Sequence, residues 1–88
     1  MNPKDVEQGE TYSVRCVCPR LDDLKPEAFW WIGRTFTAKP AWIIEHGDYA
    51  GQWAWTPTSE SCKEAGENTV GWFPGCDIEV VEWVEWRA

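Results

Sequence analysis

The sequence predicts a single, mainly β domain over residues 1–88, built as a small antiparallel barrel or sandwich of five or six short strands. Several segments rich in aromatic and β-branched residues are each long enough for one strand, and turn-forming residues separate them. A chain of 88 residues has room for only one hydrophobic core. Eight tryptophans supply the apolar surface of that core, and so many rings in so small a domain predict that some stay partly exposed.

The first half of the chain predicts two strands joined by a long connection. Residues 9–18 alternate in a period of two, which indicates a first strand with one face inward. Residues 19–28 contain two prolines and no sustained period, so we expect a connection there with one helical turn at residues 21–25. Residues 29–36 are aromatic and β-branched and predict a second strand, in which Gly33 indicates a bulge or a close backbone contact.

The middle of the chain predicts two further strands around a turn. Residues 38–40 (AKP) are expected to break the preceding strand, and residues 41–46 resume a strand pattern. The cluster HGDYAG at residues 46–51 is typical of a turn. Residues 52–57 then predict another strand, which Pro57 ends because proline cannot continue the hydrogen-bond ladder.

A polar stretch separates these strands from the last ones. It has room for one short helix that Ser59 or Ser61 caps at its start and Gly66 stops at its end. Residues 69–73 and 77–86 return to β-branched and aromatic side chains and complete the predicted set of strands.

The run GWFPGCDIEVV at residues 71–81 resembles the end of an SH3 domain. In that family a similar run leads through a tight 3₁₀ turn into a last short strand, so the resemblance implies an SH3-like small β-barrel. The family's paired tryptophans would correspond to Trp53 and Trp55, at a longer spacing. A proline and a tyrosine three positions later line the family's groove for proline-rich peptides. Pro74 matches that proline, whereas Asp77 stands in place of the tyrosine, so this part of the groove is half missing.

The last predicted strand carries acids on one side. Asp77 and Glu79 alternate with Ile78 and Val80, so we expect the two carboxylates in solvent and the two apolar side chains in the core. The pair formed by Val80 and Val81 interrupts this period and predicts a β-bulge.

The charge of the chain indicates the kind of partner. The formal net charge is −7, with a sequence pI near 4.5, and residues 60–88 carry seven acidic but only two basic residues. We therefore expect a protein partner with a basic surface, and no direct binding to nucleic acid or membranes. The sequence contains no apolar run of membrane-helix length, and its polar start lacks the features of a signal peptide, so a cytoplasmic location is expected.

The leading hypothesis is a non-enzymatic intracellular protein-binding module that uses exposed aromatic side chains together with the acidic last strand. Trp72 and Phe73 are neighbours in a strand, so one of them is expected on the outer face. The aromatic groove candidates are Trp53, Trp55, Trp72 and Pro74. The acidic candidates are Asp77, Glu79, Glu82 and Glu85.

Three alternatives to this hypothesis remain open. Carboxylates two residues apart on a strand lie roughly 6.6–7 Å apart, which is close to the phosphate spacing of a nucleic acid. The chain could therefore be an acidic nucleic-acid-mimicking inhibitor of a host defence system, of the phage-derived anti-restriction or anti-CRISPR type. The acids could instead only protect an edge strand from aggregation, or the last strand could form a homodimer.

No catalytic, metal or cofactor site is predicted. Four cysteines without a signal peptide are expected to be reduced, and Cys16 and Cys18 fit small core residues. Their spacing to the other cysteines lacks the paired knuckles of a zinc site. His46 is the only histidine, and the sequence contains no phosphate-binding loop and no nucleophile or metalloprotease motif.

Overall fold

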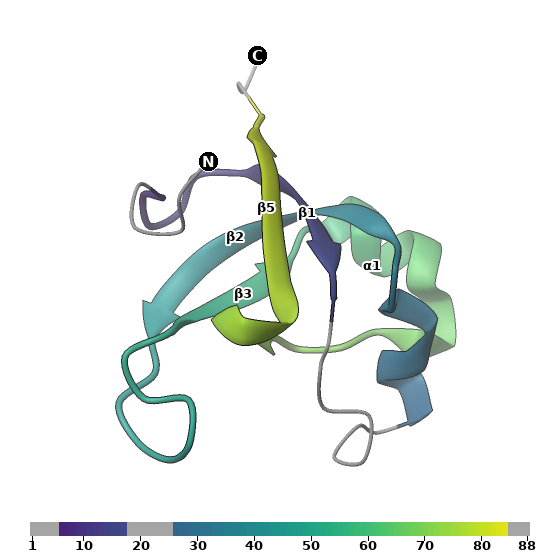
Figure 1. Cartoon of the computed structure of the whole chain (residues 1–88). Helices are drawn as coiled ribbons and strands as arrows, with labels where there is room; N and C mark the ends of the chain where they lie inside the picture. Colours follow the sequence, from purple (N-terminus) through teal and green to yellow (C-terminus); the bar gives the residue numbers. More distant parts are fainter. Residues whose placement is uncertain (1–5, 18–25, 85–88) are drawn as a thin grey trace.

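One antiparallel sheet organises the domain, and its five strands follow the order β4-β3-β2-β1-β5 (Figure 1). The computed structural model describes residues 6–17 and 26–84. The sheet confirms the predicted mainly β class, but it does not close into a barrel: β4 and β5 stand at opposite ends of the strand order, and β4 is only two residues long. The strands are β1 Tyr12–Cys16, β2 Thr35–Ile43, β3 Trp53–Pro57, β4 Phe73–Pro74 and β5 Ile78–Trp83.

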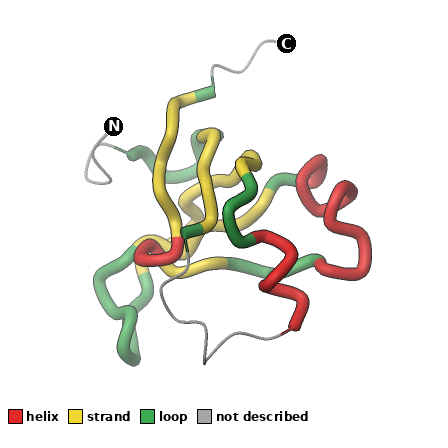
Figure 2. The backbone as a smooth tube through the Cα atoms, turned by 45° about the vertical axis from the view of Figure 1, so that its right-hand side comes forward, coloured by secondary structure: helices red, strands yellow, loops and turns green. Residues whose placement is uncertain are grey.

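Short helical segments accompany the sheet. Figure 2 shows most of them gathered on one side of the molecule, away from the loop at residues 44–52 that joins β2 to β3. None of the helices in the described ranges is long and apolar enough to cross a membrane. The helical turn expected at residues 21–25 lies outside the described residues. The segments are α1 Ser59–Ala65 and the 3₁₀ turns η3 Pro26–Trp31, η4 Gly66–Asn68 and η5 Gly75–Asp77.

The core is built around the indole of Trp31, which is completely buried. Its ring meets Phe36 and Phe73 edge to face, with ring centroids 4.6 and 5.5 Å apart. The indole N–H donates to the carbonyl of Asn68 at 2.7 Å, so the polar atom of the ring is also satisfied. Aromatic packing of this kind stabilises a domain whose length limits its core.

The second strand begins later than residues 29–36 predict. Trp31 ends the 3₁₀ turn η3, and β2 starts only at Thr35. Gly33 lies between them with a φ of 77°, a conformation that glycine adopts without strain, and its N–H donates to the carbonyl of Cys16 at 2.8 Å. The aromatic run thus serves tertiary packing rather than strand formation, because a turn is needed to place Trp31 in the core.

The break expected at residues 38–40 is absent, and β2 runs through Pro40 to Ile43. Proline lacks the N–H that a ladder needs, and the register between β2 and β3 shifts between Pro40 and Trp42. The carbonyl of Pro40 accepts a hydrogen bond from the N–H of Gly9 at 3.0 Å. A bulge therefore lets the strand pass through a proline, and it also sets the direction of Trp42.

The helix α1 lies where a short helix was predicted, but its N-cap is Thr58 and neither Ser59 nor Ser61. The Thr58 hydroxyl accepts from the N–H of Ser61 at 3.4 Å. Gly66 ends it as predicted, with a φ of 57° and a hydrogen bond from its N–H to the carbonyl of Cys62.

The end of the chain matches two local predictions. The tight 3₁₀ turn implied after Pro74 is present as η5 and leads directly into β5. Ser13 pairs with Glu82 but Val14 pairs with Val80, so Val81 forms the predicted bulge between them.

Candidate functional site

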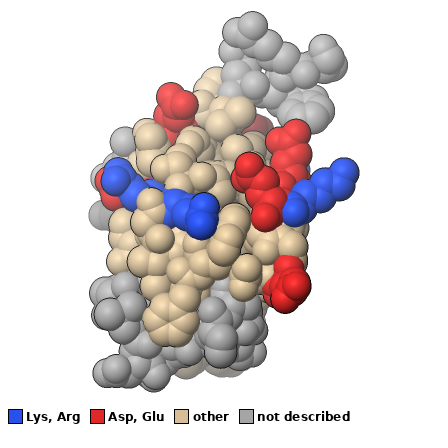
Figure 3. Space-filling view, turned by 90° about the vertical axis from the view of Figure 1, so that its right-hand side faces the viewer, with Lys and Arg blue, Asp and Glu red and all other residues tan. Residues whose placement is uncertain are grey.

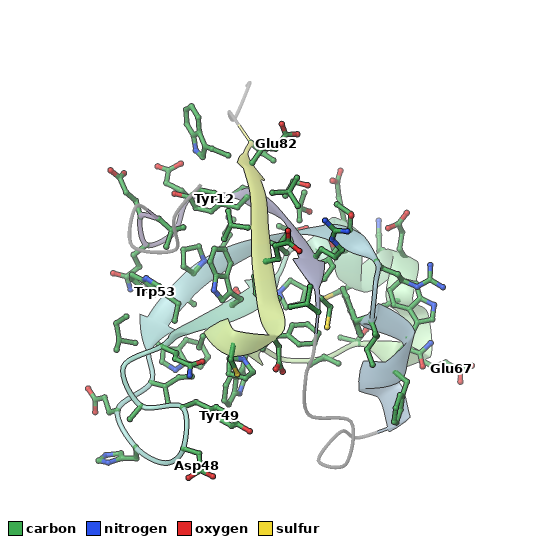
Figure 4. All side chains as sticks on the ribbon, in the orientation of Figure 1. Tyr12, Asp48, Tyr49, Trp53, Glu67 and Glu82 are labelled. Atoms are coloured by element: carbon green, nitrogen blue, oxygen red, sulfur yellow. The ribbon has the colours of Figure 1, made fainter. Side chains whose placement is uncertain are left out.

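The two tryptophans of β3 occupy different environments. Trp55 is only 2% exposed and meets Tyr12 edge to face at 5.7 Å, so the expectation of an exposed Trp55 is wrong. Its position explains the burial: it lies opposite Pro40 and Phe73, in the middle of three adjacent strands. Trp53, at the start of β3 (Figure 4), is partly buried against the core and lines a small hollow of about 270 Å³.

The chain at β4 separates an exposed ring from a buried one. Trp72 is 41% exposed and Phe73 is buried, as the alternation of neighbouring strand residues predicts. Pro74 is also buried, opposite Ala54 of β3. Pro74 was expected to line an open groove, but it is buried and so does not offer an open surface.

Trp42 is the aromatic partner of Trp72 that the sequence did not reveal. Trp42 is 44% exposed, and the two ring centroids lie 6.0 Å apart at an interplanar angle of 61°. Trp42 pairs with Ala54, which pairs in turn with Pro74, so these residues form a row on one face. We call the two rings the outer tryptophan pair. The bulge after Pro40 sets the face on which Trp42 lies, and the sequence pattern does not reveal this bulge.

The acidic candidates do not form a continuous solvated row. Asp77 was expected in solvent but is only 1% exposed, because it ends the turn η5 instead of starting the strand. Its carboxylate accepts from the Cys76 thiol at 3.5 Å, and its backbone carbonyl accepts from the N–H of Val17 at 2.9 Å. The alternation that places Ile78 and Val80 in the core is confirmed.

The remaining acids differ in their surroundings. Glu79 is exposed and forms an ion pair with Arg15 at 3.5 Å. Glu82 is exposed near the end of β5, opposite Ser13 (Figure 4). Glu85 lies outside the described residues. The acidic strand is thus partly neutralised where it is described.

Chemical groups for catalysis or metal binding are dispersed. Within residues 6–17 and 26–84, no three His, Cys, Asp or Glu side chains are placed to share a metal ion. His46 lies exposed in the loop between β2 and β3. Cys16 is buried, Cys62 is partly buried and Cys76 is exposed; Cys18 lies outside the described residues.

A groove of about 470 Å³ opens between η3 and α1. Its walls include Trp30 and Arg34 on one side and Glu64 on the other, and Trp31 and Phe36 also line it. On the face of the molecule where the helices lie, acidic and basic side chains occur next to one another (Figure 3). We call this the η3–α1 groove.

The sheet order separates the two halves of the predicted binding surface. The outer tryptophan pair lies at the central strand β2 and just before β4, whereas Glu79 and Glu82 lie on β5, at the other end of the strand order from β4. The predicted candidates therefore divide into an aromatic group and an acidic group. Comparison with protein families, curated proteins and solved structures finds no match to this chain.

Proposed function

We propose that the protein is a non-enzymatic protein-binding module whose binding surface is centred on the outer tryptophan pair. The observation that carries this proposal is the mutual packing of Trp42 and Trp72, each more than 40% exposed, on one face of the sheet. Two large rings held in place by each other lose little conformational freedom on binding, which is the property of an energetic anchor.

The support under the pair favours a fixed surface. Ala54 and Pro74 are buried in the row beside Trp42, so the backbone that carries the rings is packed. Trp42 and Trp72 together offer apolar area with indole N–H groups that can donate to a partner. A protein surface that covers both rings would remove that area from water, at roughly 25 cal/mol per Å² of apolar area buried.

The resemblance to SH3 domains is a further proposal. The turn η5, which leads directly into β5, agrees with the tight 3₁₀ turn before a last short strand that the resemblance implies. The family's peptide groove has less support, because Pro74 and Asp77 are both buried. We therefore place the binding surface at the outer tryptophan pair.

The nucleic-acid-mimic alternative has less support than protein binding through aromatic rings. A mimic needs a regular row of exposed carboxylates, but Asp77 is buried and Glu79 is paired with Arg15. Only Glu82 among the described candidates is exposed without an ion pair.

Affinity capture with matched variants tests the proposal. The immobilised protein is exposed to lysate of the source cells, and retained proteins are identified by mass spectrometry. The Trp42→Ala, Trp72→Ala double variant should lose the retained partner, whereas the control Trp83→Ala, which removes an exposed ring on β5, should keep it. Retention of the same partner by a folded double variant would refute the proposed surface.

A further inference from the structure

The backbone of Thr35 is directed away from β1 and toward the η3–α1 groove. Thr35 pairs with Arg15, and the neighbouring N–H of Cys16 donates to the carbonyl of Arg34. In an antiparallel ladder, hydrogen-bonded pairs alternate with pairs that make no mutual hydrogen bonds. Cys16 and Arg34 are a hydrogen-bonded pair, so Arg15 and Thr35 are not, and the N–H and C=O of Thr35 point to the other edge of β2. The strand β3 does not reach this edge, since it ends at Pro57 opposite Ala38.

The open edge of β2 is only one residue wide. Thr37 is the next residue of β2 whose backbone N–H and C=O point away from β1. Residues around the start of α1, and not a neighbouring strand, form its hydrogen bonds on that side. The N–H of Thr58 and the hydroxyl of Ser61 both donate to the carbonyl of Thr37 at 3.0 Å, and the N–H of Thr37 donates to the Ser61 hydroxyl at 3.1 Å. On the other side, the N–H of Arg34 donates to the carbonyl of Trp31 at 3.0 Å. Thr35 alone therefore offers backbone groups at this edge, which suits pairing with the end of a chain better than pairing with a strand that continues along β2.

Two contacts fix the guanidinium of Arg34, which lines the same groove as Thr35. Its Nε donates to the carbonyl of Trp30, and the group stacks over the Trp30 ring at 4.1 Å from the centroid. Both contacts fix the side chain and leave the two terminal nitrogens without a hydrogen bond or ion pair in the described part of the chain. A planar guanidinium with two available nitrogens matches a carboxylate in a bidentate geometry.

The opposite wall of the groove carries the opposite charge. Glu64 of α1 lines the same groove as Arg34, and the two do not form an ion pair within 4.0 Å. A ligand lying between them meets a cation at one end and an anion at the other. The groove volume of about 470 Å³ lies within the range of roughly 300–1,000 Å³ that is typical of sites for small ligands.

We propose that the η3–α1 groove binds the carboxyl-terminal end of a peptide. The terminal carboxylate lies on Arg34, one peptide residue exchanges backbone hydrogen bonds with Thr35, and a basic side chain points toward Glu64. The partly exposed ring of Trp30 offers an apolar contact in the groove, whereas Trp31 is completely buried and Phe36 is only 7% exposed. This site is separate from the outer tryptophan pair and does not depend on the proposed function.

A titration followed by ¹H–¹⁵N NMR tests the proposal. The probe is acetyl-Ala-Lys-Leu with a free carboxylate, and its matched control is the same peptide with a terminal amide. We expect the peptide with the free carboxylate to produce saturable shifts at the backbone N–H signals of Thr35 and Arg34. The control peptide with a terminal amide should bind at least about tenfold more weakly, since a charge-assisted contact is lost. Arg34→Gln should weaken binding similarly, and Arg15→Gln should not.

Three outcomes of the peptide titrations would overturn the proposal. They are the absence of saturable shifts at millimolar peptide, equal affinity of the acid and the amide, and equal affinity of a folded Arg34→Gln variant. Acetate alone serves as a further probe: if acetate binds as tightly as the peptide, the groove is a general anion site and the peptide assignment is wrong. If Arg34→Gln fails to fold, the comparison of acid and amide on the unaltered protein decides the question.

Discussion

The indoles of Trp42 and Trp72 meet edge to face on the outer side of the sheet, with ring centroids 6.0 Å apart. Trp42 lies on β2 and Trp72 directly before β4, and β3 lies between these two strands. The contact passes over Ala54, the residue of β3 that pairs with Trp42 and is completely buried. A small residue at this position lets two large rings on either side of β3 come together. The arrangement is a structured aromatic surface, in contrast to single apolar residues scattered over a protein surface.

Ala54→Leu should disturb this surface and the strands beneath it. A larger side chain at a fully buried position forces its neighbours apart, which costs about 1–3 kcal/mol of the free energy of unfolding. Urea denaturation measures the loss. The control is Ala50→Leu in the exposed loop, which should change stability little. Equal stability of both variants would show that Ala54 is not tightly packed.

Trp31→Ala should remove the centre of the core. Truncation of a buried tryptophan costs about 3–5 kcal/mol, and a small domain has a total stability of only roughly 5–15 kcal/mol. We therefore expect a variant that is largely unfolded at moderate temperature, measured by circular dichroism during heating. Trp83→Ala, which removes a ring that is 48% exposed, should keep a cooperative transition. Comparable losses from the two variants would contradict the described core.

Ser61→Ala should weaken the attachment of α1 to β2. The Ser61 hydroxyl is buried and serves both the N–H and the carbonyl of Thr37, so its removal leaves backbone groups with fewer partners at a cost of about 1–3 kcal/mol. Ser59→Ala is the matched control, since Ser59 is exposed on the same helix. Hydrogen exchange at the amide of Thr37 should accelerate only in the Ser61 variant. Unchanged protection would mean that other contacts hold α1.

The double variant Glu79→Gln, Glu82→Gln should be nearly neutral for stability. The ion pair between Glu79 and Arg15 is about half exposed on both sides, so water screens it and its loss should cost less than about 1 kcal/mol. Partner capture should also persist, because the proposed surface is aromatic. Loss of capture in this variant, with capture kept by the double tryptophan variant, would instead favour a nucleic-acid mimic.

Local patterns in the sequence predicted much of the sheet. The alternation in Tyr12, Val14 and Cys16 gave the inner face of β1, and Pro57 and Gly66 marked the ends of β3 and α1. These features depend on residues close in sequence, where period and backbone preference act directly.

The errors arise where tertiary contacts decide the conformation. Trp31 stands in an aromatic and β-branched run that is typical of a strand. Its indole is nevertheless the centre of the core, and a 3₁₀ turn places it there. Pro40 does not end β2, because a bulge absorbs it. The same bulge directs Trp42 outward to Trp72, and a one-residue change of register changes the face of every later residue in a strand. The sequence pattern therefore did not predict Trp42, which is one of the two rings of the proposed binding surface.

The most direct measurement of the proposed binding surface is a ¹H–¹⁵N NMR titration that follows the indole N–H signals of the tryptophans as the captured partner is added. If the outer tryptophan pair is the binding surface, the signals of Trp42 and Trp72 shift or broaden together, while that of Trp83 on β5 stays in place. If the Trp83 signal and the amide of Glu82 respond while the signals of Trp42 and Trp72 remain unchanged, the partner binds at the acidic edge strand and the account is wrong.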